Sequence, residues 1–367
     1  MTEARTPLYA AHLSLNAKMA PFGGFIMPIS YAGIIAEHGA VRNAAGLFDL
    51  SHMGQFTVTG PDAGLWLDGL TANAVSSMRP YQARYNIFTN ELGGARDDTI
   101  IYRLPERWLV VVNAVNTSKI WQWLHAQRRP GIELYDRTPE HALIAVQGPR
   151  SRELLQPLCA VDLTAIRSYW AAEGSVTGIA AEIARTGYTG EDGFELFVAA
   201  RDALLLWERL MAAGARFKLQ PAGLGARDVL RLEAGMPLYG HELAEDITPL
   251  QAGLDWVVNF AKGEFIGRDA LWAQKQHGGY DRIAGIIMES KAPARAGYPV
   301  MRGGRPVGTI QSGSPAPSLG GKNIATALLK EPASHAGTHL EVDIRGQLHA
   351  CTVVPQPFYK RSKAGLG

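Results

Sequence analysis

The chain of 367 residues has little cysteine, and the two cysteines it carries, Cys159 and Cys351, are far apart in the sequence. Two distant thiols supply neither a disulfide framework nor a cysteine-rich zinc or iron–sulfur site. This scarcity fits a reducing, cytoplasmic setting. The first residues include Glu3, Arg5 and His12 where a secretory signal needs an uninterrupted apolar run, so we expect no export.

Long apolar runs and an excess of one charge are also missing. A membrane-spanning helix needs about eighteen consecutive apolar residues, and even the run from Leu109 to Val115 is interrupted by Asn113. Lysine and arginine total 36 against 34 acidic residues, a formal net charge of +2. Such a balance argues against a nucleic-acid partner. We therefore expect a protein that acts neither on nucleic acid nor in a membrane.

The composition, 47% hydrophobic and 19% charged, is that of a globular chain with more than one packed core. Helical spacing of apolar residues predicts helices over residues 34–45, 118–127, 203–214 and 224–235. Apolar and alternating segments predict strands within 47–60, 85–89, 98–104, 108–115, 142–149, 179–188 and 194–198. The predicted fold class is therefore α+β.

The order of these segments predicts several domains. Residues 55–138 form a compact α+β subdomain that is inserted into a domain built from 1–54 and 139–281. From about Arg282 onward, short strands with glycine and proline turns replace the helical patterns. Residues 282–367 are therefore predicted to form a small C-terminal β-barrel.

Two adjacent acids, Asp97 and Asp98, stand at the start of the apolar segment ARDDTIIYRL. If the acids belong to the strand, its period of two places Asp98, Ile100 and Tyr102 on one face, as in a ligand pocket. The alternative is that both acids lie in the turn after Gly94 and are solvated.

The segment TGYTGEDGFELFV has glycines at positions 187, 190 and 193, followed by a strand. A phosphate-binding loop is excluded, because such a loop opens a helix and here an acidic loop precedes a strand. Alternation places Glu195 and Phe197 on the face opposite to Phe194, Leu196 and Val198. We interpret the glycines as a rigid turn that delivers Glu195 to a pocket.

Arg227 and Arg231 lie one turn apart on the predicted helix 224–235, with Asp228 and Glu233 near enough to pair with them. The alternative is a set of surface ion pairs on a solvated face.

The sequence indicates neither a metal site nor a covalent nucleophile. No histidine pair has the spacing of a zinc-protease helix, and no serine, cysteine or histidine lies in a recognisable nucleophile segment. What remains is a pocket of Asp98, Glu195, Arg227, Asn113 and aromatic residues. Such a pocket suits an uncharged heteroaromatic ligand with hydrogen-bonding edges.

Many segments together resemble the glycine cleavage T-protein family, in that family's order and over nearly the whole chain. They are TPLYAAH, GLFDLSHMG, GGARDDTIIY, VVNAVN, QGP, RTGYTGEDGFEL, PAGLGARDVLRLEAGMPLYGHEL, DITPLQAGL and PFYKR. Phe25 stands where the family usually has tryptophan, and an extra glycine lies near Gly320. These two departures concern ring packing and a barrel loop rather than the predicted site.

The resemblance implies a multidomain cloverleaf, with two interleaved mixed α/β folate-binding domains and a C-terminal small β-barrel around a channel for tetrahydrofolate. The channel is open to the lipoyl arm of a partner, the lipoylated H-protein. The implied reaction moves the aminomethyl group from dihydrolipoyl H-protein to tetrahydrofolate, giving methylene-tetrahydrofolate and ammonia.

The family's motifs carry these roles onto particular residues. The acid near the reacting folate nitrogen is Asp98, and Glu195 and Arg227 fall on folate-binding positions. The implied walls of the folate pocket are Met53, Tyr85, Ile100, Tyr102, Asn113 and Tyr169.

Two other functions resemble this one. The first is a folate-dependent demethylase, such as the folate half of a dimethylglycine or sarcosine oxidase, or a sulfonium demethylase. The oxidases come fused to a flavin domain, and no dinucleotide fingerprint is present here. The second is a non-enzymatic folate-binding module like the iron–sulfur maintenance proteins. Their KGCY-like signature surrounds neither Cys159 nor Cys351.

The last residues are basic. From Ile344 to the end the chain contains Arg345, Lys360, Arg361 and Lys363 and no acid. Such a segment is either a solvated end or, if the family resemblance holds, a surface that attracts an acidic H-protein.

Overall fold

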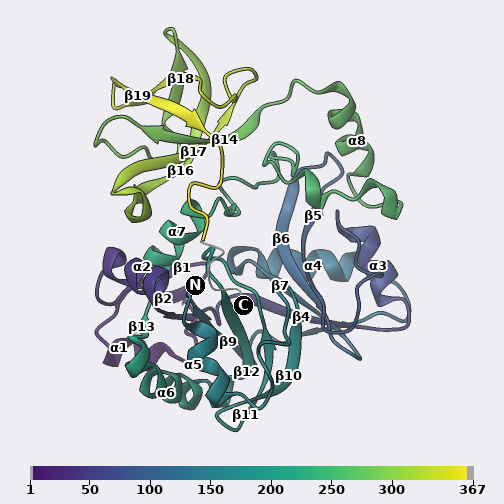
Figure 1. Ribbon diagram of the computed structural model, residues 1–367. Coiled ribbons are helices and arrows are strands. Elements are labelled where there is room, and N and C mark those ends of the chain that lie inside the picture. Colours follow the sequence, from purple (N-terminus) through teal and green to yellow (C-terminus); the bar gives the residue numbers. More distant parts are fainter. Residues whose placement is uncertain (1–2, 362–367) are drawn as a thin grey trace. The chain divides into compact units, whose positions relative to one another are not determined.

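The computed structural model describes residues 3–361 (Figure 1). They form two compact units, the first from 3–68, 74–86 and 99–227 and the second from 69–73, 87–98 and 228–361. The division of the chain into 1–54 with 139–281, 55–138 and 282–367 stays a prediction. Within the described part of the chain, no helix has the length and apolar character needed to cross a membrane.

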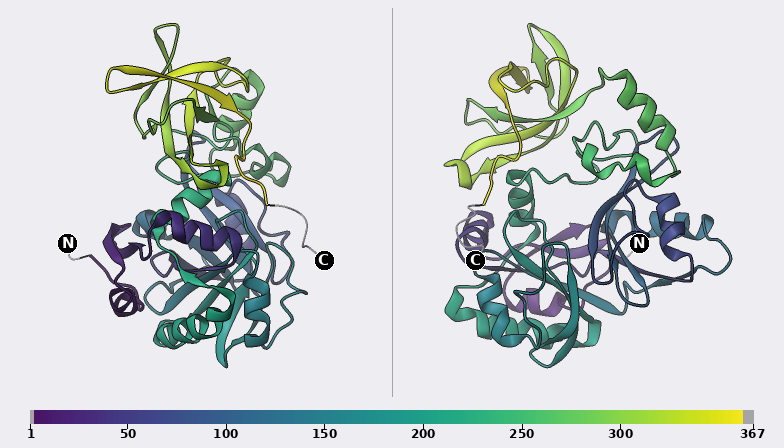
Figure 2. Two further views of the ribbon diagram at one scale, coloured as in Figure 1. Left: turned by 60° about the vertical axis from the view of Figure 1, so that its left-hand side comes forward. Right: turned by 45° about the vertical axis from the view of Figure 1, so that its right-hand side comes forward.

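A six-stranded sheet forms the centre of the first unit. Its order is β10 (Ala171–Val176), β11 (Ile179–Ala184), β12 (Gly193–Ala199), β9 (His141–Gln147), β3 (Gly46–Asp49) and β13 (Gln220–Pro221). Neighbouring strands are antiparallel except β13, which runs parallel to β3. One face of the sheet packs against helix α6 (Ala203–Gly214), which lies at the lower left in Figure 1; Figure 2 gives two further views.

The two faces of this sheet differ in what they carry. Phe194, Leu196 and Val198 of β12 belong to the apolar core shared with α6. Glu195 pairs with Ala145 of β9 and therefore leaves this core for the other face. The alternation predicted for this strand is confirmed.

A second sheet has five strands. Its order is β5 (Ala83–Thr89), β6 (Ala95–Arg103), β7 (Trp108–Val112), β4 (Gly54–Thr59) and β8 (Glu133–Asp136). Within it, β6 pairs antiparallel with β7, β7 with β4, and β4 with β8. The predicted strands are confirmed with ends shifted by up to three residues. Helix α4 (Thr117–Ala126) follows β7, and the ring of Trp121 packs on Phe56 of β4 at 5.1 Å between centroids.

Two elements near the N-terminus differ from expectation. A hairpin of β1 (Lys18–Phe22) and β2 (Phe25–Ser30) was not predicted, because prolines interrupt its apolar pattern. Its turn uses Gly23 and Gly24, whose φ values of 58° and 86° suit glycine. Helix α2 (Ile34–Asn43) ends before Gly46, which instead begins β3.

The C-terminal strands close into a barrel in the order β14 (Arg282–Met288), β17 (Lys322–Leu329), β16 (Arg305–Ala316), β15 (Pro299–Arg302), β18 (His339–Ile344) and β19 (Gln347–Val354). Pairing of β14 with β19 completes the closure (Figure 1). Its interior is apolar and includes Ile286, Ile310 and Val342. The predicted barrel and mixed α/β class are confirmed. The remaining helices are α1 (Tyr9–Ser14), α3 (Ala63–Leu70), α5 (Ser151–Leu155), α7 (Leu224–Glu233) and α8 (Arg268–His277).

Candidate functional site

A buried carboxylate lies at the centre of the candidate site in the first unit. Glu195 is 8% exposed, and its Oε2 accepts hydrogen bonds from the hydroxyls of Tyr102 (3.2 Å) and Thr186. The two hydroxyl oxygens lie 3.1 Å apart. The ring of Tyr102 meets that of Phe197 edge to face, so β6 and β12 contribute neighbouring side chains. The site thus joins residues from three separate segments.

The electrostatics of Glu195 are those of an incompletely compensated charge. Burial raises the pKa of this carboxyl, while the hydrogen bond from Thr186, the charge of Arg227 and the hydrogen bond from Tyr102 act in the opposite direction. Burial remains the larger effect, because the net change in pKa is upward. Hydrogen bonds donated by a ligand would therefore stabilise the negative charge of Glu195.

Arg227 lies beside this carboxylate at the start of α7. Its guanidinium stacks 4.3 Å from the centroid of the Tyr188 ring. Such stacking holds the planar group in one orientation. Glu195 and Arg227 line one pocket, which holds about 200 Å³ including the part open to solvent. The other residues that line it are Phe48, Leu50, Ala145, Gln147, Tyr188 and Thr189.

The charge of Glu195 also acts on the phenol of Tyr169. Burial and the negative charge of Glu195 raise the pKa of the Tyr169 phenol. The backbone of Tyr169 has a φ of 59° and accepts a hydrogen bond from Ala83 at 2.8 Å. The structure therefore brings Tyr102, Tyr169 and Arg227 close to Glu195, and their contact with folate stays a prediction.

The other four predicted pocket residues are all half-buried. Met53 lies in the turn between β3 and β4, Tyr85 in β5, and Ile100 in β6. Asn113 follows β7 and precedes α4. Their contact with a ligand stays a prediction.

The paired acids lie in β6 and not in the preceding turn. Asp97 is fully buried, and Asp98 is half-buried. The alternative in which both are solvated is therefore wrong. Both belong to the second unit, and the catalytic role of Asp98 stays a prediction.

His52, next to Met53, is a buried histidine that the motif analysis did not single out. Burial and, to a lesser extent, the charge of Arg227 lower its pKa to about 4, against the opposing effect of Asp49. The imidazole is therefore uncharged at neutral pH. It meets the ring of Phe22 edge to face at 5.7 Å between centroids.

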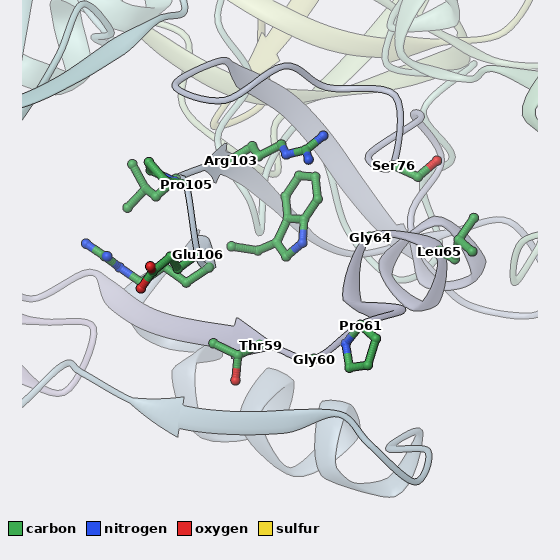
Figure 3. Close-up of a pocket in the computed structure, with 12 residues that line it drawn as sticks. Thr59, Gly60, Pro61, Gly64, Leu65, Ser76, Arg103, Pro105 and Glu106 are labelled. Atoms are coloured by element: carbon green, nitrogen blue, oxygen red, sulfur yellow. The ribbon is translucent and has the colours of Figure 1, made fainter.

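A larger pocket in the first unit lies elsewhere (Figure 3). It opens between the turn after β4 and the hairpin that joins β6 to β7, and it holds about 730 Å³ including the part open to solvent. Arg103 lies over the Trp108 ring there, 5.3 Å from its centroid. None of the predicted site residues lines this pocket.

Sequence reasoning missed Thr186 and Tyr188. Both belong to the segment RTGYTGEDGFEL, in which only the glycines and Glu195 were predicted to have a role. A polar or aromatic residue that directly flanks a rigid turn was the available signal.

Comparison with known proteins places this geometry in a family. The model of the GCVT N-terminal domain matches residues 8–262, and the model of the glycine cleavage T-protein C-terminal barrel domain matches residues 282–360. The chain belongs to the glycine cleavage T-protein family.

Relatives in this family match along almost their whole length. The aminomethyltransferase of Desulforamulus reducens is 46% identical over 358 residues, covering 97% of this chain and 98% of the relative. That of Symbiobacterium thermophilum is 47% identical over 365 residues, covering 97% of each.

A solved structure of the family has the same fold. The crystal structure of the glycine cleavage system aminomethyltransferase T from Bartonella henselae matches with a TM-score of 0.92 at 31% identity. The match covers 98% of this chain and 99% of that one.

Proposed function

We propose that the chain transfers the aminomethyl group from the dihydrolipoyl arm of an H-protein to tetrahydrofolate, releasing ammonia. The chain is an aminomethyltransferase of the glycine cleavage T-protein family. Relatives with this activity in their names match from end to end, so a demethylase or a non-enzymatic folate module is not favoured.

The observation that carries the proposal is the buried Glu195 carboxylate beside Arg227. A pterin ring presents N–H and amino donors along one edge, and a desolvated carboxylate accepts such donors in charge-assisted hydrogen bonds. Tyr102 and Tyr169 supply aromatic surface next to Glu195. Together they suit a flat heteroaromatic ligand with a polar edge.

Asp98 is proposed as the acid near the reacting folate nitrogen, and this role rests on the GGARDDTIIY motif. Transfer from sulfur to nitrogen passes through an iminium-like carbon, which carries positive charge. A fixed negative charge stabilises that carbon and can orient protons near the departing ammonia. No metal or covalent nucleophile is needed for this step.

The remaining folate contacts are assigned by motif in the same way. Met53, Tyr85, Ile100 and Asn113 are proposed as walls of the folate pocket. Each lies in the first unit.

The donor is proposed to be a lipoylated H-protein. Lys360 and Arg361 lie in the described part of the basic tail, whereas Lys363 lies outside the described residues. Complementary charge between this tail and an acidic carrier would raise the rate of encounter. A reducing cytoplasmic setting is part of the proposal, since Cys159 and Cys351 are both free thiols.

The test is ammonia release from aminomethylated H-protein with and without tetrahydrofolate. We expect tetrahydrofolate to accelerate release and to be converted stoichiometrically to methylene-tetrahydrofolate. Free aminomethyl-dihydrolipoamide, without the carrier protein, is the control and should react far more slowly. Turnover of dimethylglycine or a sulfonium donor, with none from H-protein, would overturn the proposal.

A further inference from the structure

Gln147, at the end of β9, holds the glycine loop that leads into β12. The side chain is 2% exposed. Its Nε2 donates to the backbone oxygen of Thr186 at 3.0 Å, and its Oε1 accepts from the hydroxyl of Thr189 at 3.1 Å. One amide therefore fixes the loop at two points that are three residues apart.

The position of the Gln147 amide explains why residues 187 and 193 are glycines. A Cβ added to Gly187 would lie 2.0 Å from Oε1 of Gln147, and one added to Gly193 would lie 2.5 Å from its Cδ. Both distances are shorter than any real contact, so neither position accepts a side chain while Gln147 keeps its place. Gly190, between them, has a φ of 80°. The loop is thus wrapped around the glutamine amide.

The same loop supplies the hydroxyl that orients Glu195. Thr186 donates to Oε2 of Glu195, and Tyr102 donates to the same oxygen. Among the described residues, Oε1 of Glu195 accepts no hydrogen bond. The carboxylate is therefore turned with one oxygen occupied and the other available.

We propose that Gln147 is a positioning residue for tetrahydrofolate binding: it acts through Thr186 to hold Glu195 with Oε1 presented to the donors of the pterin. The proposal rests on the function proposed above, in which Glu195 binds folate. Both the nitrogen and the oxygen of the Gln147 amide form hydrogen bonds with the loop, so its effect on the ligand is indirect.

The positioning role predicts how the pH dependence of folate binding changes in the variants. The titratable groups that act on Glu195 are Tyr102, Tyr169 and Arg227. The bond from Thr186 favours the ionised form of Glu195, so loosening Thr186 raises the pKa of this carboxyl further. Folate binding needs the ionised form. Binding would then fail at a higher pH as the solution is acidified.

The variants are Gln147→Met, Thr186→Val and the double variant, each measured for tetrahydrofolate affinity, KM and kcat between pH 5 and 8. We expect each single variant to weaken folate binding about tenfold, the loss of one hydrogen bond to a charged group. The acid limb of binding should move to higher pH, and kcat should change by less than about threefold. The double variant should bind tetrahydrofolate about as tightly as either single variant, because both substitutions remove the same interaction.

Gln156→Met is the matched control. Gln156 also holds a loop by its amide, donating to the oxygen of Val161 at 3.0 Å and accepting from the N–H of Leu163 at 2.8 Å. It lies outside the pocket of Glu195. The control should lose stability as Gln147→Met does, with folate affinity and the acid limb unchanged.

Glu195→Ala separates the two levels of the proposal. If Glu195→Ala leaves folate affinity intact, the proposed function of Glu195 is wrong. If Glu195→Ala weakens binding but Gln147→Met and Thr186→Val behave like Gln156→Met, the positioning role is wrong. Additive losses in the double variant would also overturn it. Should Gln147→Met fail to fold, Thr189→Val replaces it, because it removes the hydroxyl that donates to Oε1 of Gln147 and keeps the bond between Thr186 and Glu195. An acid limb unchanged by Thr189→Val would then overturn the positioning role.

Discussion

Arg231 is the residue whose loss we expect to destabilise the second unit most. It is 1% exposed and lies on α7. Its guanidinium donates to Asp228 at 2.8 Å, to Glu242 at 2.9 Å and to the hydroxyl of Ser312 in the barrel strand β16 at 2.9 Å. One side chain therefore links a helix, a loop and the barrel.

The magnitude follows from what Arg231→Met would leave behind. Glu242 is 3% exposed and would keep a buried charge without its counterion. Removing one partner of a buried ion pair typically lowers the free energy of unfolding by about 3–5 kcal/mol. Asp228 adds little, since its side chain is 53% exposed.

The stability loss caused by Arg231→Met should depend on pH in a defined direction. Burial alone would raise the pKa of Glu242, but the charge of Arg231 and a hydrogen bond from Thr326 hold it below the ordinary value of 4.5. Without Arg231 the folded-state pKa rises above the unfolded value. The variant then loses stability as pH increases from 4.5 through its new pKa, by up to about 1.4 kcal/mol per pH unit. The deficit relative to the wild type is therefore largest at neutral pH and shrinks steadily as the solution is acidified, because below pH 4.5 the wild type also loses the stability that its lowered Glu242 pKa provides.

The assay is urea unfolding of the whole chain at pH 7 and near pH 5, compared with Arg268→Met. Arg268 pairs with Glu264 at 3.6 Å and Asp269 at 3.2 Å, both exposed, so its loss should cost less than about 1 kcal/mol. Adding Glu242→Gln to Arg231→Met should recover part of the loss. An equal deficit for Arg231→Met and Arg268→Met, or one that does not shrink in acid, would refute the reasoning.

The remaining predictions concern activity, with Asp97→Asn as a stability control. Asp98→Asn should lower kcat about 100- to 1000-fold while folate binding persists, and a rate within about threefold of wild type would remove the charge role. Asp97→Asn should act on stability rather than kcat, since Asp97 is fully buried. Glu195→Ala should weaken tetrahydrofolate binding by about 1.5–3 kcal/mol in calorimetry. Lys360→Glu with Arg361→Glu should raise KM for H-protein and flatten its salt dependence, with folate affinity unchanged; curves identical to wild type at two salt concentrations would exclude docking by the tail.

Local periodicity predicted those parts of the fold in which one face of an element is buried. The strand around Glu195 was assigned correctly because Phe194, Leu196 and Val198 alternate toward the core. The hairpin of β1 and β2 escaped prediction because Pro21 and Pro28 break that alternation. In that segment the turn residues were the better signal.

The site was predicted less completely than the fold, because its partners meet through space. Asp228, three residues before Arg231, was foreseen as an ion-pair partner, whereas Glu242 lies in a loop without a periodic pattern. The interpretation of Arg231 as part of a solvated face is wrong, since the barrel covers it. Gln147 and Thr186 are 39 residues apart, and nothing local in the sequence indicates that they touch.

Three deeply buried carboxyls show why Glu195 is the one suited to a ligand. Burial would raise the pKa of Asp49 and of Glu242, yet their partners, with His12 and Arg231 the largest contributors respectively, together more than offset it, so both pKa values are lowered. Those two acids already have their partners within the fold, as structural acids should. Glu195 is held by hydroxyls and a nearby arginine, and its pKa stays raised. Hydrogen-bond donors from a ligand would lower it, so folate binding and ionisation of Glu195 should reinforce each other.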